Sequence, residues 1–169
     1  MTQALPRRSD ARPRTTPTNP HTQLDQQPTD LTIARHLADR AFALPAVEER
    51  PSAISVPGAR ALWLREGVPA GPREAFMIDR EFAHLHPAPD FSLHLTLPPA
   101  WVDHVLAQSW GELHPMATRG LIPATTVMVY APRNAEELEV VSRILRVSHN
   151  FAGGPGQSDQ SDQKEARSD

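Results

Sequence analysis

A stretch of alternating residues from 80 to 97 constrains the fold more than any other part of the chain. Polar and apolar residues alternate on both sides of a Pro-Ala-Pro-Asp turn, and this pattern predicts a β-hairpin. Successive side chains of a strand point to opposite faces, so the pairing register decides which residues meet. A five-residue loop over 87–91 pairs His84 with His94. A four-residue loop would mix polar and apolar residues on both faces, and we therefore expect the five-residue loop.

This register gives the hairpin two faces of different chemistry. The polar face carries Arg80, Phe82, His84, His86, Ser92, His94 and Thr96. The opposite face carries Ala83, Leu85, Leu93, Leu95 and Leu97. Three of the chain's eight histidines gather on the polar face, so we expect chemistry there.

Both ends of the chain differ in composition from its middle. Residues 1–28 are rich in Arg, Pro, Thr and Gln and have almost no large apolar side chain, and residues 153–169 are rich in Gly, Ser, Asp and Gln. Such segments do not bury enough apolar surface to offset the entropy lost on ordering. We expect disordered tails at both ends and one domain over residues 29–152, which is an ordinary domain size.

Periodic patterns in the middle predict three helices and several short strands. One helix begins near Asp30 and ends before Pro45, a second runs from Pro98 to about Gly111, and a third runs from Asn134 to about Ser148. The strand candidates besides the hairpin are 53–56, 61–64, 75–78 and 125–131. Short connections favour antiparallel pairing. The order predicts an α+β fold, a single domain with a mostly antiparallel sheet packed by about three helices.

Composition excludes several classes of function. The net charge of -3 and the pI near 6.2 give no reason to expect nucleic acid or an anionic membrane as a partner. The absence of cysteine excludes disulfides and thiolate zinc sites, and the only lysine, Lys164, lies in the expected tail, which excludes a Schiff-base lysine. No apolar run is long enough to span a bilayer, so we expect a cytoplasmic protein. Nothing in the sequence indicates the oligomeric state.

The histidine face of the hairpin has three interpretations. Neighbouring residues on one face lie close enough for His84, His86 and His94 to converge on a metal ion. Alternatively, a neutral imidazole accepts a proton well at neutral pH, and Arg80 on the same face would stabilise the resulting anion. In the third interpretation, these side chains form the solvated outer face of the sheet.

Two further segments carry candidate binding residues. Glu112 and His114 follow the second helix; they would lie on one side of an extended chain, where Glu112 orients an imidazole, or else belong to a surface loop. Tyr130 and Arg133 close a strand just before the third helix, whose N-terminus would attract a carboxylate, enolate or phosphate. The alternative for Arg133 is an ion pair with a nearby glutamate of that helix.

Four motifs in this order resemble the bacterial members of the luciferase-domain family, a domain also found in fungal luciferases. They are Arg-Glu-Phe-Ala-His-Leu-His-Pro at 80–87, Asp-Phe-Ser-Leu-His-Leu at 90–95, Trp-Gly-Glu-Leu-His-Pro at 110–115 and Val-Met-Val-Tyr-Ala-Pro-Arg at 127–133. The resemblance covers about residues 58–150. It departs from the family at Phe91, where the family usually shows glycine after the aspartate of the turn.

In the fungal relatives, the resemblance implies an oxygenase that uses no cofactor. An electron-rich hydroxypyrone reacts with dioxygen, and the peroxide intermediate loses carbon dioxide with light emission; we expect no light emission from this chain. Such chemistry needs a base that makes the substrate anion and a cation that holds it.

Three functions follow as alternatives. The first is a small oxygenase that needs neither metal nor other cofactor and acts on a phenolic or pyrone-like enolisable molecule. In it His84 or His94 is the base and His86 supports it. Arg80 and Arg133 bind the anion, and the further substrate-binding candidates are Glu112, His114 and Tyr130. The second is a small-molecule-binding module without catalysis, and the third is a histidine-based metal site.

Overall fold

A computed structural model of the chain describes residues 4–153 and shows an α+β domain built on one six-stranded sheet. The strands are β1 (Val47–Pro51), β2 (Arg60–Leu64), β3 (Glu81–Leu85), β4 (Leu93–Thr96), β5 (Gly111–Leu113) and β6 (Thr126–Val129). The helices are α1 (Leu31–Phe42), α2 (Pro99–Ala107), α3 (Pro115–Thr118) and α4 (Ala135–Phe151), with a short 3-10 turn at Arg73–Ala75.

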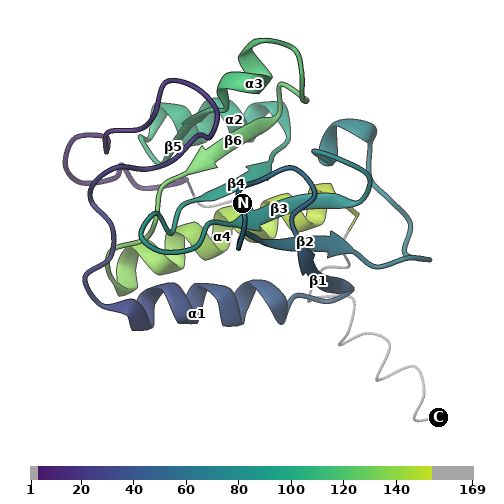
Figure 1. Ribbon diagram of the computed structural model, residues 1–169, viewed down its shortest axis with the longest axis horizontal. Coiled ribbons are helices and arrows are strands. Elements are labelled where there is room, and N and C mark those ends of the chain that lie inside the picture. The colour runs from purple at the N-terminus through teal and green to yellow at the C-terminus, as the bar shows by residue number, and fades with distance from the viewer. Residues whose placement is uncertain (1–3, 154–169) are drawn as a thin grey trace.

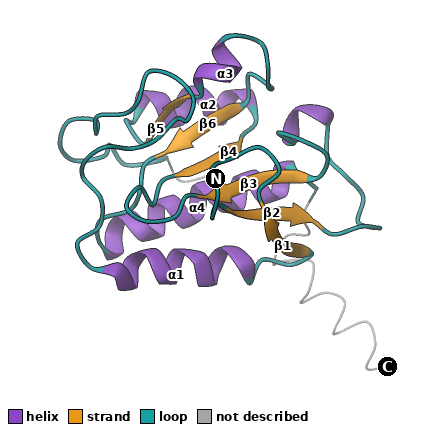
Figure 2. Cartoon of the chain, viewed as in Figure 1, coloured by secondary structure: helices purple, strands orange, loops and turns teal. Residues whose placement is uncertain are grey.

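All neighbouring strands of the sheet pair antiparallel, in the order β1-β2-β3-β4-β6-β5 (Figure 2). The one departure from sequence order is β6, which lies between β4 and β5. β6 pairs with β4 of the hairpin on one side and with β5, the strand after α2, on the other. Side chains from the hairpin and from β5 therefore come together on one face of the sheet. The predicted antiparallel α+β fold is confirmed.

One face of the sheet is covered by helices. α4 contacts β3 and β4, and α1 packs beside α4 and reaches β1 (Figure 1). The apolar face of the hairpin lies in this layer, where Leu93 and Leu95 are fully buried together with Val141 and Ile144 of α4. This face is the hydrophobic core, so the polar face of the hairpin looks the other way.

The hairpin has the register expected from its sequence. Ala83 pairs with Leu95 and His84 pairs with His94, while the amide of His86 donates to the carbonyl of Ser92 at 2.9 Å. The five-residue loop is therefore confirmed.

The expected helix starts also hold. The side chain of Asp30 accepts a hydrogen bond from the Thr32 amide at the start of α1, and the side chain of Asn134 accepts one from the Glu137 amide at the start of α4. Each cap satisfies a backbone donor that has no partner within the helix. α4 continues beyond the expected end near Ser148 to Phe151.

Two of the expected strands are absent from the described sheet. Residues 53–56 form bends because the Ser52 hydroxyl accepts hydrogen bonds from the amides of Ile54 and Ser55, which holds the backbone in a turn. Residues 75–78 end the 3-10 turn and make only an isolated bridge between Ile78 and Glu81. The edge strands β1 and β5 take part instead. β5 has only three residues, and β1 is mostly charged, with Glu48, Glu49 and Arg50 in a row, so neither shows a clear alternation.

The N-terminal segment lies against the domain, although the sequence predicts a disordered tail over residues 1–28. Within the described part of it, Leu5 joins the hydrophobic core and the indole nitrogen of Trp110 donates to the Pro6 carbonyl at 2.7 Å. The side-chain oxygen of Gln23 accepts a hydrogen bond from the Ala131 amide at 2.9 Å. Composition did not predict the ordered packing of this segment, because most of it is held by hydrogen bonds and these do not require large apolar residues. The expected tail over 153–169 lies outside the described residues except for Gly153.

Gly111 permits the close approach of β5 to β6, and its replacement tests this packing. A Cβ atom at position 111 would lie 2.2 Å from the carbonyl oxygen of Met128. We expect Gly111→Ala to lower the free energy of unfolding by about 1–3 kcal/mol, the usual cost of overpacking, in urea titrations. Ala124→Ser, at an exposed position before β6, is the control and should change it by less than about 0.5 kcal/mol. An unchanged midpoint for Gly111→Ala would contradict the close approach.

Candidate functional site

A cavity of about 210 Å³ opens over the polar face of the β3–β4 hairpin. Its walls come from the N-terminal segment, from the loop between β1 and β2, and from α3 and the loop after it. The lining residues are Asn19, Pro20, His21, Ile54, Ser55, Val56, Met77, His84, His86, His94, His114, Met116 and Ile122. Five of these thirteen residues are histidines, which separates this cavity from an ordinary apolar crevice.

The hairpin supplies three of the five imidazoles, and all three are buried. Nε2 of His84 lies 3.0 Å from Nδ1 of His94 across the strand pair. The His86 ring stacks on that of His84 with 5.4 Å between centroids and meets the His94 ring edge-on at 4.6 Å. The solvated-face interpretation is therefore wrong, because His84, His86 and His94 are each less than 5 % exposed.

Carboxylates hold two of these rings in orientation. Glu81, which is fully buried, accepts from Nδ1 of His84 at 2.9 Å, and Asp90 accepts from Nδ1 of His86 at 2.5 Å. Glu81 also accepts from the Ser52 hydroxyl at 2.6 Å. Because Nδ1 is engaged in both rings, it is Nε2 of each ring that remains for other partners; in His86 it lies 3.2 Å from the Ser55 hydroxyl.

His21 of the N-terminal segment extends the network to a third carboxylate. Nδ1 of His21 lies 3.2 Å from Nε2 of His94, and the two rings stack with 5.2 Å between centroids. Nε2 of His21 lies 2.7 Å from Glu112. A continuous chain of contacts thus runs from Glu81 through His84, His94 and His21 to Glu112.

Glu112 is the outer anchor of this chain. It accepts hydrogen bonds from the Thr15 hydroxyl at 2.6 Å and from the Tyr130 hydroxyl at 2.8 Å, in addition to its contact with His21. Tyr130 is itself buried. Glu112 and Tyr130 therefore act on the cavity through His21, since neither residue is among its lining.

Burial keeps the central imidazoles neutral. Desolvation lowers the pKa of His84, although the hydrogen bond to Glu81 opposes this, and it lowers the pKa of His94 well below its usual value, with help from the neighbouring histidines. Burial raises the pKa of Asp90, but the hydrogen bonds from His86 and Ser92 outweigh it and the net pKa is lowered. At neutral pH the rings of His84 and His94 are therefore neutral and Asp90 is ionised.

His114 lies at the rim of the cluster and has a structural role as well. Its Nδ1 accepts a hydrogen bond from the Met116 amide at 3.0 Å, which caps α3, and its ring approaches that of His94 with 4.5 Å between centroids. Burial, followed by repulsion from the other histidines, lowers the pKa of His114 to about 4. A neutral ring that accepts at Nδ1 carries its proton on Nε2.

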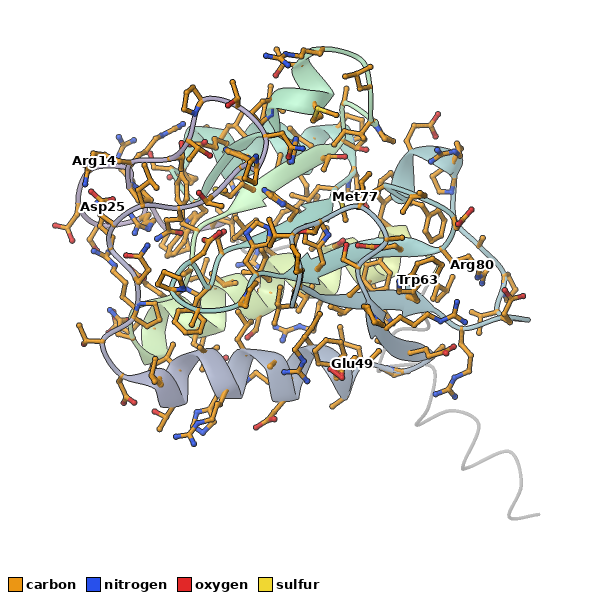
Figure 3. The ribbon with its side chains drawn as sticks, viewed as in Figure 1. Arg14, Asp25, Glu49, Trp63, Met77 and Arg80 are labelled. Carbon is orange, nitrogen blue, oxygen red and sulfur yellow. The ribbon has the colours of Figure 1, made fainter. Side chains whose placement is uncertain are left out.

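The two candidate arginines lie apart from the cavity. The guanidinium of Arg80 donates to three backbone carbonyls, those of Leu64, Arg65 and Val68. Figure 3 shows it away from Met77, which lines the cavity. Side-chain alternation does not hold at Arg80 because β3 begins only at Glu81.

Arg133 forms an ion pair with a glutamate of α4, which was the alternative to anion binding in the sequence analysis. Its Nε donates to Glu137 at 3.0 Å, and its guanidinium also pairs with Asp10 of the N-terminal segment at 2.8 Å. Through these contacts the guanidinium of Arg133 joins the start of α4 to the N-terminal segment. Arg133 does not line the histidine cavity.

Sequence reasoning missed four groups of this site: His21, Ser55, Glu81 and Asp90. Glu81 stands between Arg80 and Phe82, which the sequence assigns to the polar face, so strict alternation predicts that Glu81 points to the apolar face. The structure instead has an irregularity in the pairing of β2 with β3 next to Trp63, the residue that pairs with Glu81. Asp90 was assigned only to the turn. His21 carries no local pattern, and its only signal is that it is a histidine in a segment otherwise without large side chains.

Fold and site together define a class: a small α+β domain with a buried, carboxylate-supported histidine cluster at the base of a cavity. Residues 79–148 match the family model described as "Luciferase domain". The matched stretch includes the whole hairpin, Glu112, His114 and Tyr130. Residues 79–148 of the chain are therefore similar to a luciferase domain.

Fungal luciferases are among the proteins that this chain resembles. The chain is 34% identical over 163 residues to a luciferase of Armillaria ostoyae, covering 87% of this chain and 60% of that protein, and a luciferase of Armillaria mellea gives the same values. A luciferase of Neonothopanus nambi is 40% identical over 74 residues, covering 43% of this chain and 28% of that protein. The chain thus spans about 60% of the length of the Armillaria relatives. No solved structure matches the chain.

The described part of the chain, residues 4–153, has no helix that combines the length and apolar character needed to cross a membrane.

Replacing Glu112 tests its role as the outer anchor. Glu112→Gln keeps the shape but removes the charge, so the donors Thr15, His21 and Tyr130 no longer share one carboxylate. We expect the free energy of unfolding to fall by about 1–3 kcal/mol. Burial first and Glu112 second raise the pKa of Tyr130, so this pKa should fall in the variant. Tyr130 is the only tyrosine, so its ionisation is read directly from ultraviolet absorbance during an alkaline titration.

The matched control is Glu66→Gln, at an exposed position. It should leave both the stability and the tyrosine titration unchanged. Equal stability of Glu112→Gln and the parent protein would show that the network does not depend on this carboxylate.

Proposed function

We propose that this protein is an oxygenase that acts on an enolisable phenolic or pyrone-like small molecule bound in the histidine cavity. The observation that carries the proposal is the burial of neutral imidazoles at the base of a cavity within a domain similar to a luciferase domain. Perturbed histidines in a concave site are a frequent mark of a catalytic centre.

The cavity has the two surfaces that such a substrate needs. Ile54, Val56, Met77, Met116 and Ile122 form apolar walls suited to a flat ring. The floor of imidazoles, His84, His86 and His94, offers nitrogen lone pairs to an enol hydroxyl. A ring held between these surfaces would direct its acidic hydroxyl toward the histidines.

Deprotonation is the step that prepares the substrate for oxygen. Loss of the O–H proton to the histidine network leaves an enolate, whose electron-rich carbon then donates electrons to dioxygen and forms a carbon–oxygen bond in a peroxide. The buried site favours this step because water is largely excluded from the imidazoles. The oxidant is dioxygen, and the substrate supplies the electrons.

Two adjacent residues near the cavity give a matched test of where the substrate binds. Ile122 lines the cavity, whereas Leu121 is 64% exposed and does not. We expect Ile122→Trp to obstruct the cavity and reduce oxygen uptake with hydroxypyrone and catechol substrates at least about tenfold, the effect of about 1.4 kcal/mol on the barrier. Leu121→Trp should retain the activity of the parent protein.

The measurement is oxygen consumption with an electrode, accompanied by calorimetric titration of the same compounds. Oxygen uptake that is equal in both variants would place the reaction elsewhere. Calorimetric binding that Ile122→Trp abolishes, with no oxygen uptake by the parent protein for any of these compounds, would favour the non-catalytic binding module over the oxygenase.

A further inference from the structure

The chain of contacts from Glu81 to Glu112 runs through three imidazoles. Four close contacts join Glu81, His84, His94, His21 and Glu112, at 2.9, 3.0, 3.2 and 2.7 Å. A neutral imidazole carries one N–H and one lone pair, so three of them supply three hydrogens. Both ends of the chain are carboxylates, which only accept when ionised.

The hydrogen that is missing belongs between two particular nitrogens. If His84 donates to Glu81, its Nε2 carries a lone pair. If His21 donates to Glu112 and His94 donates to His21, Nδ1 of His94 also carries a lone pair. These two nitrogens face each other at 3.0 Å, and two lone pairs at that distance repel unless a proton or a metal ion lies between or beside them.

A third nitrogen is available at the same place. With its Nδ1 hydrogen engaged by Asp90, His86 has a lone pair on Nε2, whose contact in the structure is the Ser55 hydroxyl. The rings of His84, His86 and His94 can each offer one nitrogen, Nδ1 or Nε2, such that the three atoms lie within 4.8 Å of one another.

We propose that Nε2 of His84, Nε2 of His86 and Nδ1 of His94 bind a divalent first-row transition-metal ion. Imidazole nitrogens suit zinc, iron, cobalt, nickel and copper. A tetrahedral zinc ion with bonds near 2.0 Å separates its ligands by about 3.3 Å, which is close to the 3.0 Å between Nε2 of His84 and Nδ1 of His94. Three protein ligands leave a coordination position open, as in catalytic sites.

The surroundings of the three rings support an ion of this charge. Ligating histidines commonly donate their second nitrogen to a carboxylate, and His84 and His86 do so directly, while His94 reaches Glu112 through His21. Three carboxylates thus converge on the cluster. None of the described residues that line the cavity is an arginine or a lysine, so no side chain of fixed positive charge lies in its walls to balance them.

A second trio of histidines, His21, His94 and His114, also lies within 4.8 Å, but its bonding is less suitable. Nδ1 of His114 accepts from the Met116 amide, so Nε2 of the neutral ring carries a hydrogen and has no lone pair for an ion. His21 lies between His94 and Glu112, where both of its nitrogens are engaged. The hairpin trio is therefore the site.

A metal ion here would extend the proposed function, on which this part of the inference rests. A substrate hydroxyl bound at the open position would lose its proton more readily, because the ion stabilises the enolate oxygen. This replaces the cofactor-free scheme that the family resemblance implies. The metal site itself stands on the histidine geometry and does not require an oxygenase.

The test uses the full chain purified without an affinity tag. After treatment with a chelator and its removal, the protein is titrated with Co²⁺ and Zn²⁺ and followed by visible absorption and by calorimetry. We expect one ion per chain, a Co²⁺ spectrum of low-symmetry coordination, and an increase in Tm on addition of Zn²⁺.

Variants locate the ion. His86→Ala should abolish the Co²⁺ spectrum, and Asp90→Asn, which keeps all three ligands, should weaken binding about 10- to 100-fold. His114→Ala should retain the affinity of the parent protein, and so should His36→Ala at an exposed position on α1. Circular dichroism of each variant verifies that it is folded.

Three results would overturn the site: no ion bound by the folded parent protein, equal affinity in His86→Ala and the parent, or loss of binding in His114→Ala but not in His86→Ala. Oxygen consumption is measured separately. Metal binding without oxygen uptake would refute the proposed oxygenase and leave the metal site. Oxygen uptake by a protein that binds no metal ion would refute the metal site and leave the oxygenase.

Discussion

The pairing of His84 with His94 across β3 and β4 is the interaction on which the rest of the site depends. It places two imidazole nitrogens 3.0 Å apart on the face of the sheet opposite the core. Every other group of the network touches one of these two rings or supports a neighbour that does. A shift of the hairpin register by one residue would exchange the two faces, putting imidazoles into the core and leucines into the cavity. The leucines of the opposite face thus hold the histidines in place through the hydrophobic effect.

The parts of the fold that follow from local pattern were predictable from the sequence. The hairpin register followed because a four-residue loop would mix polar and apolar residues on both faces. The starts of α1 and α4 followed from the capping side chains of Asp30 and Asn134. Edge strands were not predictable, because β5 has three residues and too few alternations to distinguish it from a loop. Arg80 was misplaced because alternation was extended one residue beyond the start of its strand.

The candidate site was predictable only where it lies within the hairpin. His84, His86 and His94 share a face, and pattern alone brings them together. His21 reaches them from 73 residues away along the chain, and the contact depends on how the N-terminal segment crosses the sheet. Such a long-range contact leaves no periodic signal in a single sequence. The carboxylates Glu81 and Asp90 were close in sequence, yet their roles depend on a strand irregularity and on a turn conformation that alternation does not describe.

The passage of the N-terminal segment over the sheet has a consequence for what counts as the functional unit. The stretch that matches the family model begins at residue 79, but His21 and Ser55, both in the walls of the cavity, precede it. A fragment cut at the borders of that match would keep the imidazole floor and lose part of the enclosure, leaving His94 open to water on the side that His21 now covers. Comparisons among relatives that are confined to the shared stretch therefore overlook residues that shape the ligand's surroundings.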